Sequence, residues 1–336
     1  MSRYAAAHAN PQGAGDARPT ALQIVKDEGM ENKLQGKVAV ITGVSSGIGI
    51  ETARALAATG ATLYLTARDV SKAEAALKDF LDPTRMTLVE LDLASLASVR
   101  AAAEKILAKE DKISLLINNA GVMAVPDRQL TEDGHELQFG TNHLAHFLLF
   151  QLLKPALLAG SSKDFQSRVV NVASTAHQLH ALNAFDNYNF ANGGYDPWLA
   201  YGQSKTANIY TANEIERRYG SRGLHATSLH PGGIATALSR HMPPEQLAGM
   251  LSNDALVRVL KTPEQGAATT TWAAIGKEWE GKGGKYLNNC TVAEGINEVA
   301  DFQGPGLAKH TYDEAEESRL WKDSLRLVGL AQEGDE

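Results

Sequence analysis

The chain has 336 residues, of which 43% are hydrophobic and 21% are charged, and this is the composition of an ordinary globular protein. Its formal net charge of −7 at pH 7 argues against a nucleic-acid-binding protein, because such domains are normally basic. Cys290 is the only cysteine, which excludes an internal disulfide and a cysteine-based metal cluster.

Strands and helices are predicted to alternate along most of the chain. Residues 1–20 are polar and small and lack a hydrophobic period, so we expect a partly disordered N-terminal extension over residues 1–33. Short β-branched and apolar runs predict strands at residues 37–42, 61–67, 86–91, 113–117, 167–172, 224–229 and 284–287. Amphipathic or alanine-rich segments predict helices at residues 48–59, 71–80, 95–109, 130–158, 200–219 and 263–275.

This alternation predicts an α/β protein with a Rossmann-type, doubly wound parallel sheet of about seven strands and helices on both faces. No linker divides the sheet, so we expect a single catalytic domain over residues 34–294 and a C-terminal extension over residues 295–336. The most apolar stretch, residues 144–158, is too short to span a bilayer. With no apolar leader, a cytoplasmic protein without a membrane span is the expectation.

A glycine-rich turn follows the first predicted strand. Residues 42–49 read TGVSSGIG, and the glycines allow a backbone to approach a pyrophosphate at the N-terminus of the following helix. A glycine-rich turn without a ligand is the alternative. The candidate phosphate-binding residues are Gly43, Ser45, Ser46, Gly47, Ile48 and Gly49.

The end of the second predicted strand bears on the choice of cofactor. In a dinucleotide-binding fold, an acidic residue there accepts the ribose 2′-hydroxyl and a basic residue binds a 2′-phosphate. Arg68 has the planar donor fork that suits a phosphate, which favours NADP. NAD stays open if the neighbouring Asp69 faces the ribose instead.

Three further residues form a candidate catalytic group. Tyr201 and Lys205 are four residues apart at the start of a predicted helix and therefore share one face. A nearby ammonium favours the phenolate and lowers the pKa of a tyrosine. Ser174 follows the fifth predicted strand, at the edge of the sheet where ligands bind in open α/β folds. Thr175 is the alternative hydroxyl.

Together these motifs resemble the short-chain dehydrogenase/reductase family over roughly residues 34–290. The resemblance also includes NNAG at residues 118–121, Asn142 within FGTNHLAHF, and Pro231-Gly232 after the sixth predicted strand. The segments NVASTAH and WLAYGQSKTAN are similar to those of the retinol-dehydrogenase-like and WW-domain-oxidoreductase-like branch of this family.

The resemblance implies a role for each matching position. Tyr201 would be the general acid or base, Ser174 would stabilise the substrate oxygen, and Lys205 would bind ribose and lower the Tyr201 pKa. Asn142 would position the main chain and a proton-relaying water. The remaining cofactor contacts implied are Asp92, Leu93, Asn119, Ala120, Gly121, Pro231, Gly232 and Thr236.

The sequence thus predicts an NADP(H)-dependent enzyme, a carbonyl reductase or alcohol dehydrogenase that acts on the CH–OH/C=O pair of a lipophilic or polyketide-like small molecule. A non-redox isomerase or epimerase on this fold, and a non-catalytic nucleotide-binding scaffold, are the alternatives. No metal site is expected, because the histidines lack further ligands at metal-binding spacing. The apolar helices at residues 144–158 and 200–219 suggest a homodimer through a helix bundle, as in the family, although their faces also suit a core.

Overall fold

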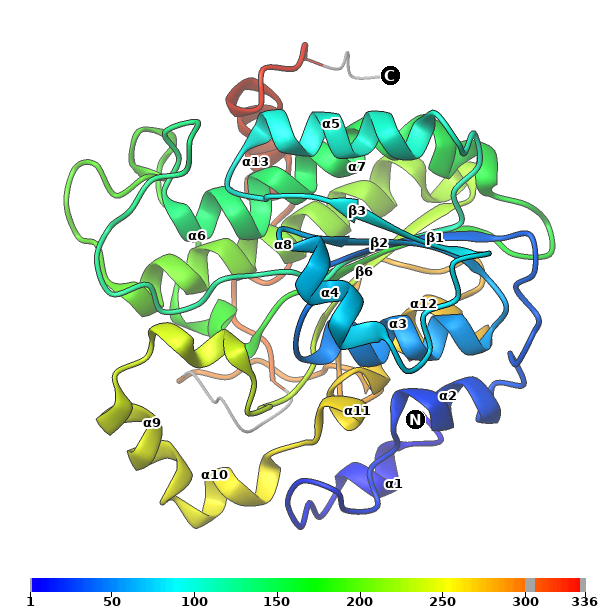
Figure 1. Ribbon diagram of the computed structural model, residues 1–336. Helices are drawn as coiled ribbons and strands as arrows, with labels where there is room; N and C mark the ends of the chain where they lie inside the picture. Colours follow the sequence, from blue (N-terminus) through cyan, green and yellow to red (C-terminus); the bar gives the residue numbers. More distant parts are fainter. Residues whose placement is uncertain (1, 300–305, 333–336) are drawn as a thin grey trace.

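The computed structural model describes residues 2–299 and 306–332 and has one eight-stranded sheet at its centre (Figure 1). The strand order is β3-β2-β1-β4-β5-β6-β7-β8; the first seven are parallel, and β8 pairs antiparallel with β7. The strands are β1 (Val38–Thr42), β2 (Thr62–Ala67), β3 (Met86–Glu90), β4 (Leu115–Asn118), β5 (Ser167–Val172), β6 (Leu224–His230), β7 (Lys285–Asn288) and β8 (Thr291–Val292). The predicted doubly wound α/β fold is confirmed, with β8 as an addition.

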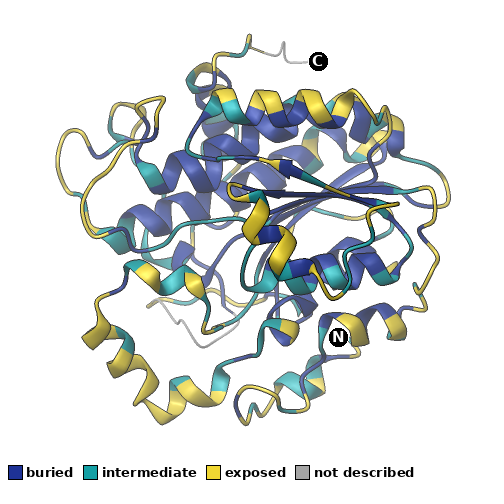
Figure 2. Cartoon of the chain, viewed as in Figure 1, coloured by how far each residue is buried: buried dark blue, intermediate teal, exposed yellow. Residues whose placement is uncertain are grey.

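Helices cover both faces of the sheet. One face carries α5 (Leu96–Leu107), α7 (Ala145–Gly160) and α8 (Pro197–Tyr219), and the other carries α2 (Ala21–Asp27), α3 (Ile48–Ala58) and α12 (Ala268–Ile275). Each layer buries its own apolar cluster against the strands, as Figure 2 shows by the dark interior. The shorter helices are α1 (Ala5–His8), α4 (Val70–Leu77), α6 (Leu137–Phe139), α9 (Pro244–Leu251), α10 (Asp254–Val259) and α11 (Pro263–Gly266).

The strand order reverses between β1 and β4. Chains that leave β1 and β4 turn in opposite directions, which opens a crevice at the carboxyl ends of these strands. The glycine-rich turn follows β1, and the NNAG segment follows β4. The topology therefore brings both motifs to the same crevice.

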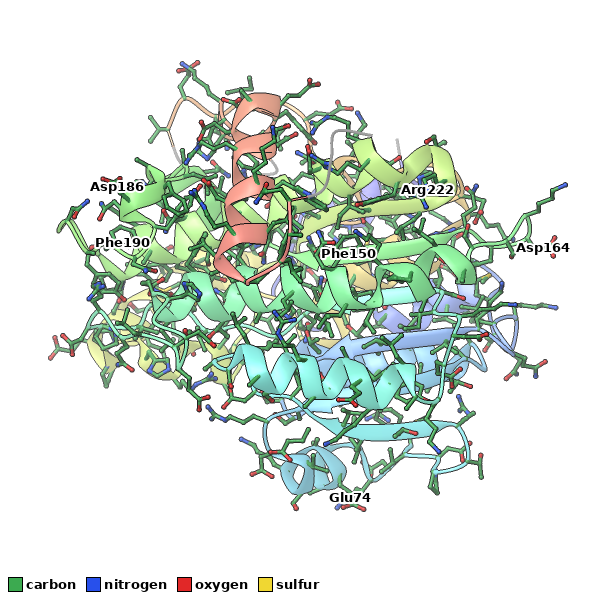
Figure 3. The ribbon with its side chains drawn as sticks, turned by 90° about the horizontal axis from the view of Figure 1, so that it is seen from above. Glu74, Phe150, Asp164, Asp186, Phe190 and Arg222 are labelled. Carbon is green, nitrogen blue, oxygen red and sulfur yellow. The ribbon has the colours of Figure 1, made fainter. Side chains whose placement is uncertain are left out.

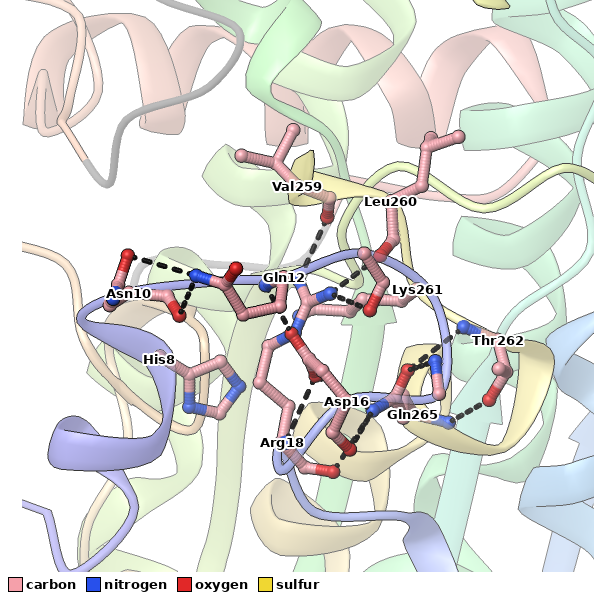
Figure 4. Close-up of polar contacts among 12 residues, drawn as sticks. His8, Asn10, Gln12, Asp16, Arg18, Val259, Leu260, Lys261, Thr262 and Gln265 are labelled. Atoms are coloured by element: carbon pink, nitrogen blue, oxygen red, sulfur yellow. Dashed lines mark hydrogen bonds and ion pairs between the residues drawn. The ribbon is translucent and has the colours of Figure 1, made fainter. Parts of the chain in front are cut away.

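The N-terminal segment, which we expected to be partly disordered, packs against the rest of the chain instead. Arg18 is 4% exposed and donates to the backbone carbonyls of Val259 and Leu260 at 2.8 and 2.5 Å, while Asp16 pairs with its Nε at 2.7 Å (Figure 4). Gln265 donates to the carbonyls of Asp16 and Arg18. Val259, Leu260 and Gln265 lie about 250 residues from Asp16 and Arg18 in the sequence. A local hydrophobic period therefore cannot predict these contacts.

The segment after β6 contains the most exposed helices of the molecule. Neither α9 nor α10 buries a residue, and both appear mostly yellow in Figure 2. Met250 and Leu251 are 40% and 49% exposed.

One continuous helical run, Leu137–Gly160, is long and apolar enough for a membrane span by length and composition alone. Its apolar window is 72% buried inside the fold, where it forms part of the core beside the sheet. A core helix passes the same test, so this run is weak evidence for a membrane span.

Candidate active site

The glycine-rich turn is packed too closely for side chains. Gly43 and Gly47 have φ angles of 77° and 66°, in the region that favours glycine. A Cβ on Gly43 would lie 2.7 Å from the Cβ of Ala120, and one on Gly49 would lie 2.2 Å from the carbonyl oxygen of Gly43. The spacing of the glycines is therefore a geometric requirement of this turn.

The turn leads directly into α3, whose N-terminus has no side-chain cap. Uncapped N–H groups at a helix N-terminus are suited to bind an anion. The residues present therefore fit a pyrophosphate. Ser45, Ser46, Gly47 and Ile48 all lie in the last part of the turn or at the helix start.

Asn119 holds the turn from the neighbouring strand. Its side-chain Nδ2 donates to the carbonyl of Thr42 at 2.8 Å and to that of Gly43 at 3.3 Å. The backbone N–H groups of Asn119 and Ala120 donate to the Thr42 hydroxyl at 2.9 and 3.0 Å. Asn119 therefore shapes the nucleotide turn with its side chain, beyond the ribose contact that the sequence suggested.

Arg68 and Asp69, the two candidates for contact with the adenosine ribose, differ in their hydrogen bonds. The carboxylate of Asp69 accepts the backbone N–H of Lys72 at 2.9 Å and so caps α4. Arg68 and Asp69 are both exposed directly after β2, and the cap uses only Oδ1 of Asp69. Thr66 is buried, and its hydroxyl has no hydrogen-bond partner in the described structure.

The predicted adenine contacts lie one strand further along, after β3. The Asp92 carboxylate accepts the N–H of Ala94 at 2.9 Å, and Leu93 is 8% exposed. Their position at the carboxyl end of β3 is consistent with the predicted contact.

The Ser174 and Tyr201 side chains are brought together at the carboxyl end of β5 and the start of α8. Burial raises the pKa of Tyr201 to about 12, and hydrogen bonding from the Ser174 side chain acts in the opposite direction. Tyr201 is 4% exposed, and Ser174 is 9% exposed. Ser174 rather than Thr175 is thus the partner of the tyrosine.

Lys205 lies beside the phenol of Tyr201, and within residues 2–299 and 306–332 its ammonium is bonded to a backbone carbonyl rather than to a carboxylate. Its Nζ is 5.4 Å from the centroid of the Tyr201 ring and donates to the carbonyl of Val172 at 3.0 Å. Burial lowers the Lys205 pKa to about 7, because desolvation disfavours the charged form. Burial is the largest cause for both groups: it raises the pKa of Tyr201 and lowers that of Lys205.

Asn142 lies in a π-helical turn, η1 (Gly140–Leu144), between α6 and α7. Its Oδ1 accepts the N–H of Val122 at 2.8 Å, and its Nδ2 donates to the carbonyl of Val122 at 2.9 Å and to the Ser204 hydroxyl at 2.9 Å. A Cβ on Gly121 would lie 3.1 Å from Asn142 Oδ1 and 3.6 Å from Lys205 Nζ. Asn142 therefore ties the NNAG segment to the helix that carries Tyr201.

The segment after β6 closes the other side of the crevice. A Cβ on Gly47 would lie 3.3 Å from Cγ2 of Thr236, so this residue neighbours the glycine-rich turn. Pro231 and Gly232 lie next to Lys261, whose Nζ donates to the carbonyl of Pro231 at 3.1 Å.

Two buried residues at the site escaped the sequence analysis as site residues. Lys261 is 3% exposed and also donates to Asn289 at 2.8 Å; it lies 30 residues from Pro231, and no sequence signal connects them. His146 donates to the Asn142 carbonyl at 2.9 Å, and its spacing of four residues from Asn142 is the signal that was available.

The loop before Tyr201 packs inward. His177 is fully buried, with Nδ1 donating to the Ser174 carbonyl at 2.7 Å, and Tyr188 stacks on Phe139 at 4.9 Å. The His177 ring thus holds the backbone of Ser174, and the contact between Tyr188 and Phe139 packs the loop onto α6. Within residues 2–299 and 306–332, no group of three histidine, cysteine, aspartate or glutamate side chains is arranged to hold a metal ion.

A parallel sheet with a glycine-rich nucleotide turn at its switch point, and a serine and a tyrosine side by side next to a lysine, defines a class of dinucleotide-dependent oxidoreductases. Residues 37–247 match the family model for short chain dehydrogenases, and the chain belongs to that family.

Individual relatives agree with this assignment. The chain is 49% identical to the short-chain dehydrogenase/reductase prx1 of Penicillium roqueforti over 330 residues, covering 98% of this chain and 96% of the relative. It is 38% identical to human retinol dehydrogenase 13 over 302 residues, covering 88% and 86% of the two chains. Among solved structures, the Pseudomonas aeruginosa RhlG/NADP active-site complex matches with a TM-score of 0.60 and 25% identity, over 76% of this chain and 95% of that chain.

Proposed function

We propose that the protein is an NADP(H)-dependent oxidoreductase that interconverts a ketone or aldehyde and an alcohol. The observation that carries the proposal is the grouping of the buried side chains of Ser174, Tyr201 and Lys205 beside the segment that follows the glycine-rich turn's neighbouring strand. NADPH, when bound, supplies the hydride.

The protonation of Tyr201 favours the reductive direction. With a pKa of about 12, the phenol is neutral at pH 7 and holds the proton that a developing alkoxide requires. Ser174 adds a second hydroxyl, which stabilises negative charge on the substrate oxygen. In the oxidative direction the same hydroxyl acts in reverse, as the base that takes the proton of the alcohol.

The supporting residues keep this pair in place. Lys205, held by the Val172 carbonyl, lies where it binds the ribose next to the nicotinamide. Asn142 fixes the NNAG segment against α8, and we assign it the positioning role that the family resemblance implies. Pro231, Gly232 and Thr236 bound the nicotinamide end of the crevice.

NADP is favoured over NAD by the different tasks of two side chains. Asp69 is engaged as the cap of α4, and a carboxylate that already accepts a backbone N–H is less available to a ribose. Arg68 is exposed and offers its planar fork to a 2′-phosphate. The related solved structure, RhlG, was obtained with NADP.

For the substrate, we propose a lipophilic small molecule. The support is the apolar side chains that α9 exposes after Thr236, among them Met250 and Leu251. The retinol dehydrogenase named among the relatives is consistent with an apolar alcohol or carbonyl. We retain a cytoplasmic location as part of the proposal.

The proposal is tested by incubating the protein with NADPH and a panel of aliphatic, aromatic and polyketide-like ketones and aldehydes. Consumption of NADPH with formation of the alcohol is expected. Conversion of a substrate to an isomer without net loss of NADPH would support the alternative of an isomerase or epimerase. NADPH binding with no conversion of any substrate would support a non-catalytic scaffold.

A further inference from the structure

The C-terminal helix α13 (Glu314–Leu327) covers the helices that the sequence marked as a pairing surface. Figure 3 shows it crossing the outer side of the helical layer that contains Phe150. Its Leu320, Trp321 and Leu325 are each at most 2% exposed and belong to the same apolar cluster as α5, α7 and α8. The parts of α7 and α8 that contact these side chains are therefore already buried within one chain.

Trp321 is the centre of this contact. Its ring meets Phe147 of α7 edge-on at 5.0 Å between centroids, and lies 6.1 Å from Phe150 and 6.3 Å from Tyr219 of α8. Arg218 lies over the same ring at 4.9 Å. A large aromatic side chain that spans two helices gives both burial and a fixed orientation.

Buried polar contacts make the position of α13 specific. Glu317 accepts Nδ2 of Asn213 at 2.6 Å and pairs with Arg217. Glu214 of α8 pairs with Arg217 and Arg218. Both carboxylate side chains are at most 2% exposed, so each depends on its partners to offset desolvation.

The same helix also reaches the catalytic elements. The Ser324 hydroxyl is 2.8 Å from Nε2 of His143, the residue after Asn142. Asp323 accepts the Tyr188 hydroxyl at 3.0 Å, and the Tyr188 carbonyl accepts the side chain of Gln203, two residues after Tyr201.

We infer that α13 takes, within a single chain, the place that a second copy would take on α7 and α8, so that the protein is a monomer whose active site is braced by its own C-terminal helix. The homodimer through these helices that the sequence suggested is replaced by this intramolecular contact. The monomeric state holds whether or not the proposed reaction is correct, whereas the bracing of the active site rests on the proposed function.

The mass of the full chain in solution tests this directly. Sedimentation velocity over a range of micromolar concentrations should give a single species near the chain mass of 36.0 kDa. A dimer that persists across that range would overturn the inference. This result needs no variant and is therefore independent of any effect on folding.

A pair of substitutions tests the role of α13 itself. Trp321→Ala removes the ring that joins α7 and α8, and the expected result is concentration-dependent self-association together with faster amide exchange in both helices. Lys322→Ala is the matched control, because this neighbour on α13 is exposed and should leave mass and exchange unchanged. A Trp321→Ala protein that stays monomeric with unchanged exchange would contradict the inference.

Ser324→Ala separates bracing from simple burial. It removes the contact with His143 while keeping the apolar contacts of α13, so the mass should stay that of a monomer. Carbonyl turnover should fall severalfold, with NADPH affinity unchanged. Unchanged turnover would contradict the bracing of the active site by α13. The monomeric state would still be tested by the sedimentation measurement.

Discussion

The His146 imidazole donates from Nδ1 to the backbone carbonyl of Asn142 at 2.9 Å, and its Nε2 lies 2.8 Å from the Thr42 hydroxyl. Because a carbonyl only accepts, Nδ1 carries the proton and Nε2 accepts from Thr42. Burial lowers the His146 pKa to about 4, which keeps this neutral tautomer at physiological pH. One ring therefore links the π-helical turn of Asn142 to the threonine that anchors the nucleotide turn.

His146→Phe should weaken both ends of this link. The Thr42 hydroxyl would lose the acceptor at 2.8 Å and keep only the longer contact with the Ile117 carbonyl at 3.5 Å, at a cost of about 1–3 kcal/mol in the free energy of unfolding, and kcat should fall about tenfold. The check is a double-mutant cycle with Thr42→Val, measured by denaturant unfolding and by turnover. The two losses should be less than additive in the double variant, whereas strictly additive losses would show that the residues act separately.

The strands of the sheet and the motifs of the site could be predicted from the sequence because each is a local pattern. A strand is a short apolar run, and the glycine turn, NNAG and the Tyr201–Lys205 pair each occupy a few consecutive residues. The contacts it missed join segments far apart, such as Arg18 with Leu260 and Ser324 with His143. A hydrogen bond between two distant segments produces no hydrophobic periodicity in either of them, so the sequence pattern does not predict it.

Arg68→Ala should weaken NADPH binding about tenfold to a hundredfold, which is the loss of charge-assisted hydrogen bonds to a phosphate. NADH binding should change little, because NADH lacks the 2′-phosphate. Titration of each nucleotide by fluorescence measures both. Asp69→Ser is the control, since serine also caps helices; equal weakening of NADPH and NADH binding by Arg68→Ala would argue against a 2′-phosphate contact.

Lys205→Met should stabilise the protein while it abolishes turnover. Replacing a buried, unpaired cation by an apolar side chain of similar length gains about 1–4 kcal/mol, and the Val172 carbonyl keeps a donor in Asn208. Hydride transfer loses the ammonium that binds ribose. Denaturant unfolding and steady-state turnover measure the two effects on the same preparations.

The gain from Lys205→Met should depend on pH in one direction. The lysine pKa is about 7 in the folded chain against 10.5 for the ordinary group, so between these values the unfolded state binds more protons. Stability of the parent protein from this residue therefore rises with pH through that window. The advantage of the variant should be largest near pH 6 and shrink toward pH 10; a constant advantage would contradict the lowered pKa.

Gly49→Ala should weaken nucleotide binding because it displaces the backbone of the glycine-rich turn. Its Cβ would lie 2.2 Å from the Gly43 carbonyl oxygen, so the turn must shift, at a cost of about 1–3 kcal/mol. Isothermal titration should show NADPH affinity reduced at least about tenfold. Gly249→Ala in α9 is the matched control: no atom lies within 4 Å of its Cβ, and binding should not change.

The pKa values of the site residues could not be predicted from the sequence, for a different reason. The Tyr201–Lys205 spacing predicts proximity, and the structure has them adjacent. Their pKa values depend on how completely other elements exclude water, and here burial raises one and lowers the other. Spacing along a helix carries no information about that exclusion.

The proposed donation of a proton by Tyr201 to the substrate oxygen can be measured by single-turnover reduction of a carbonyl substrate by the Tyr201→Phe protein preloaded with NADPH. The phenyl ring keeps the packing and removes only the hydroxyl, so NADPH affinity should stay within about threefold of the parent value while hydride transfer slows by about 10²–10⁴-fold. A Tyr201→Phe protein that binds NADPH and reduces the substrate at the parent rate would contradict the claim.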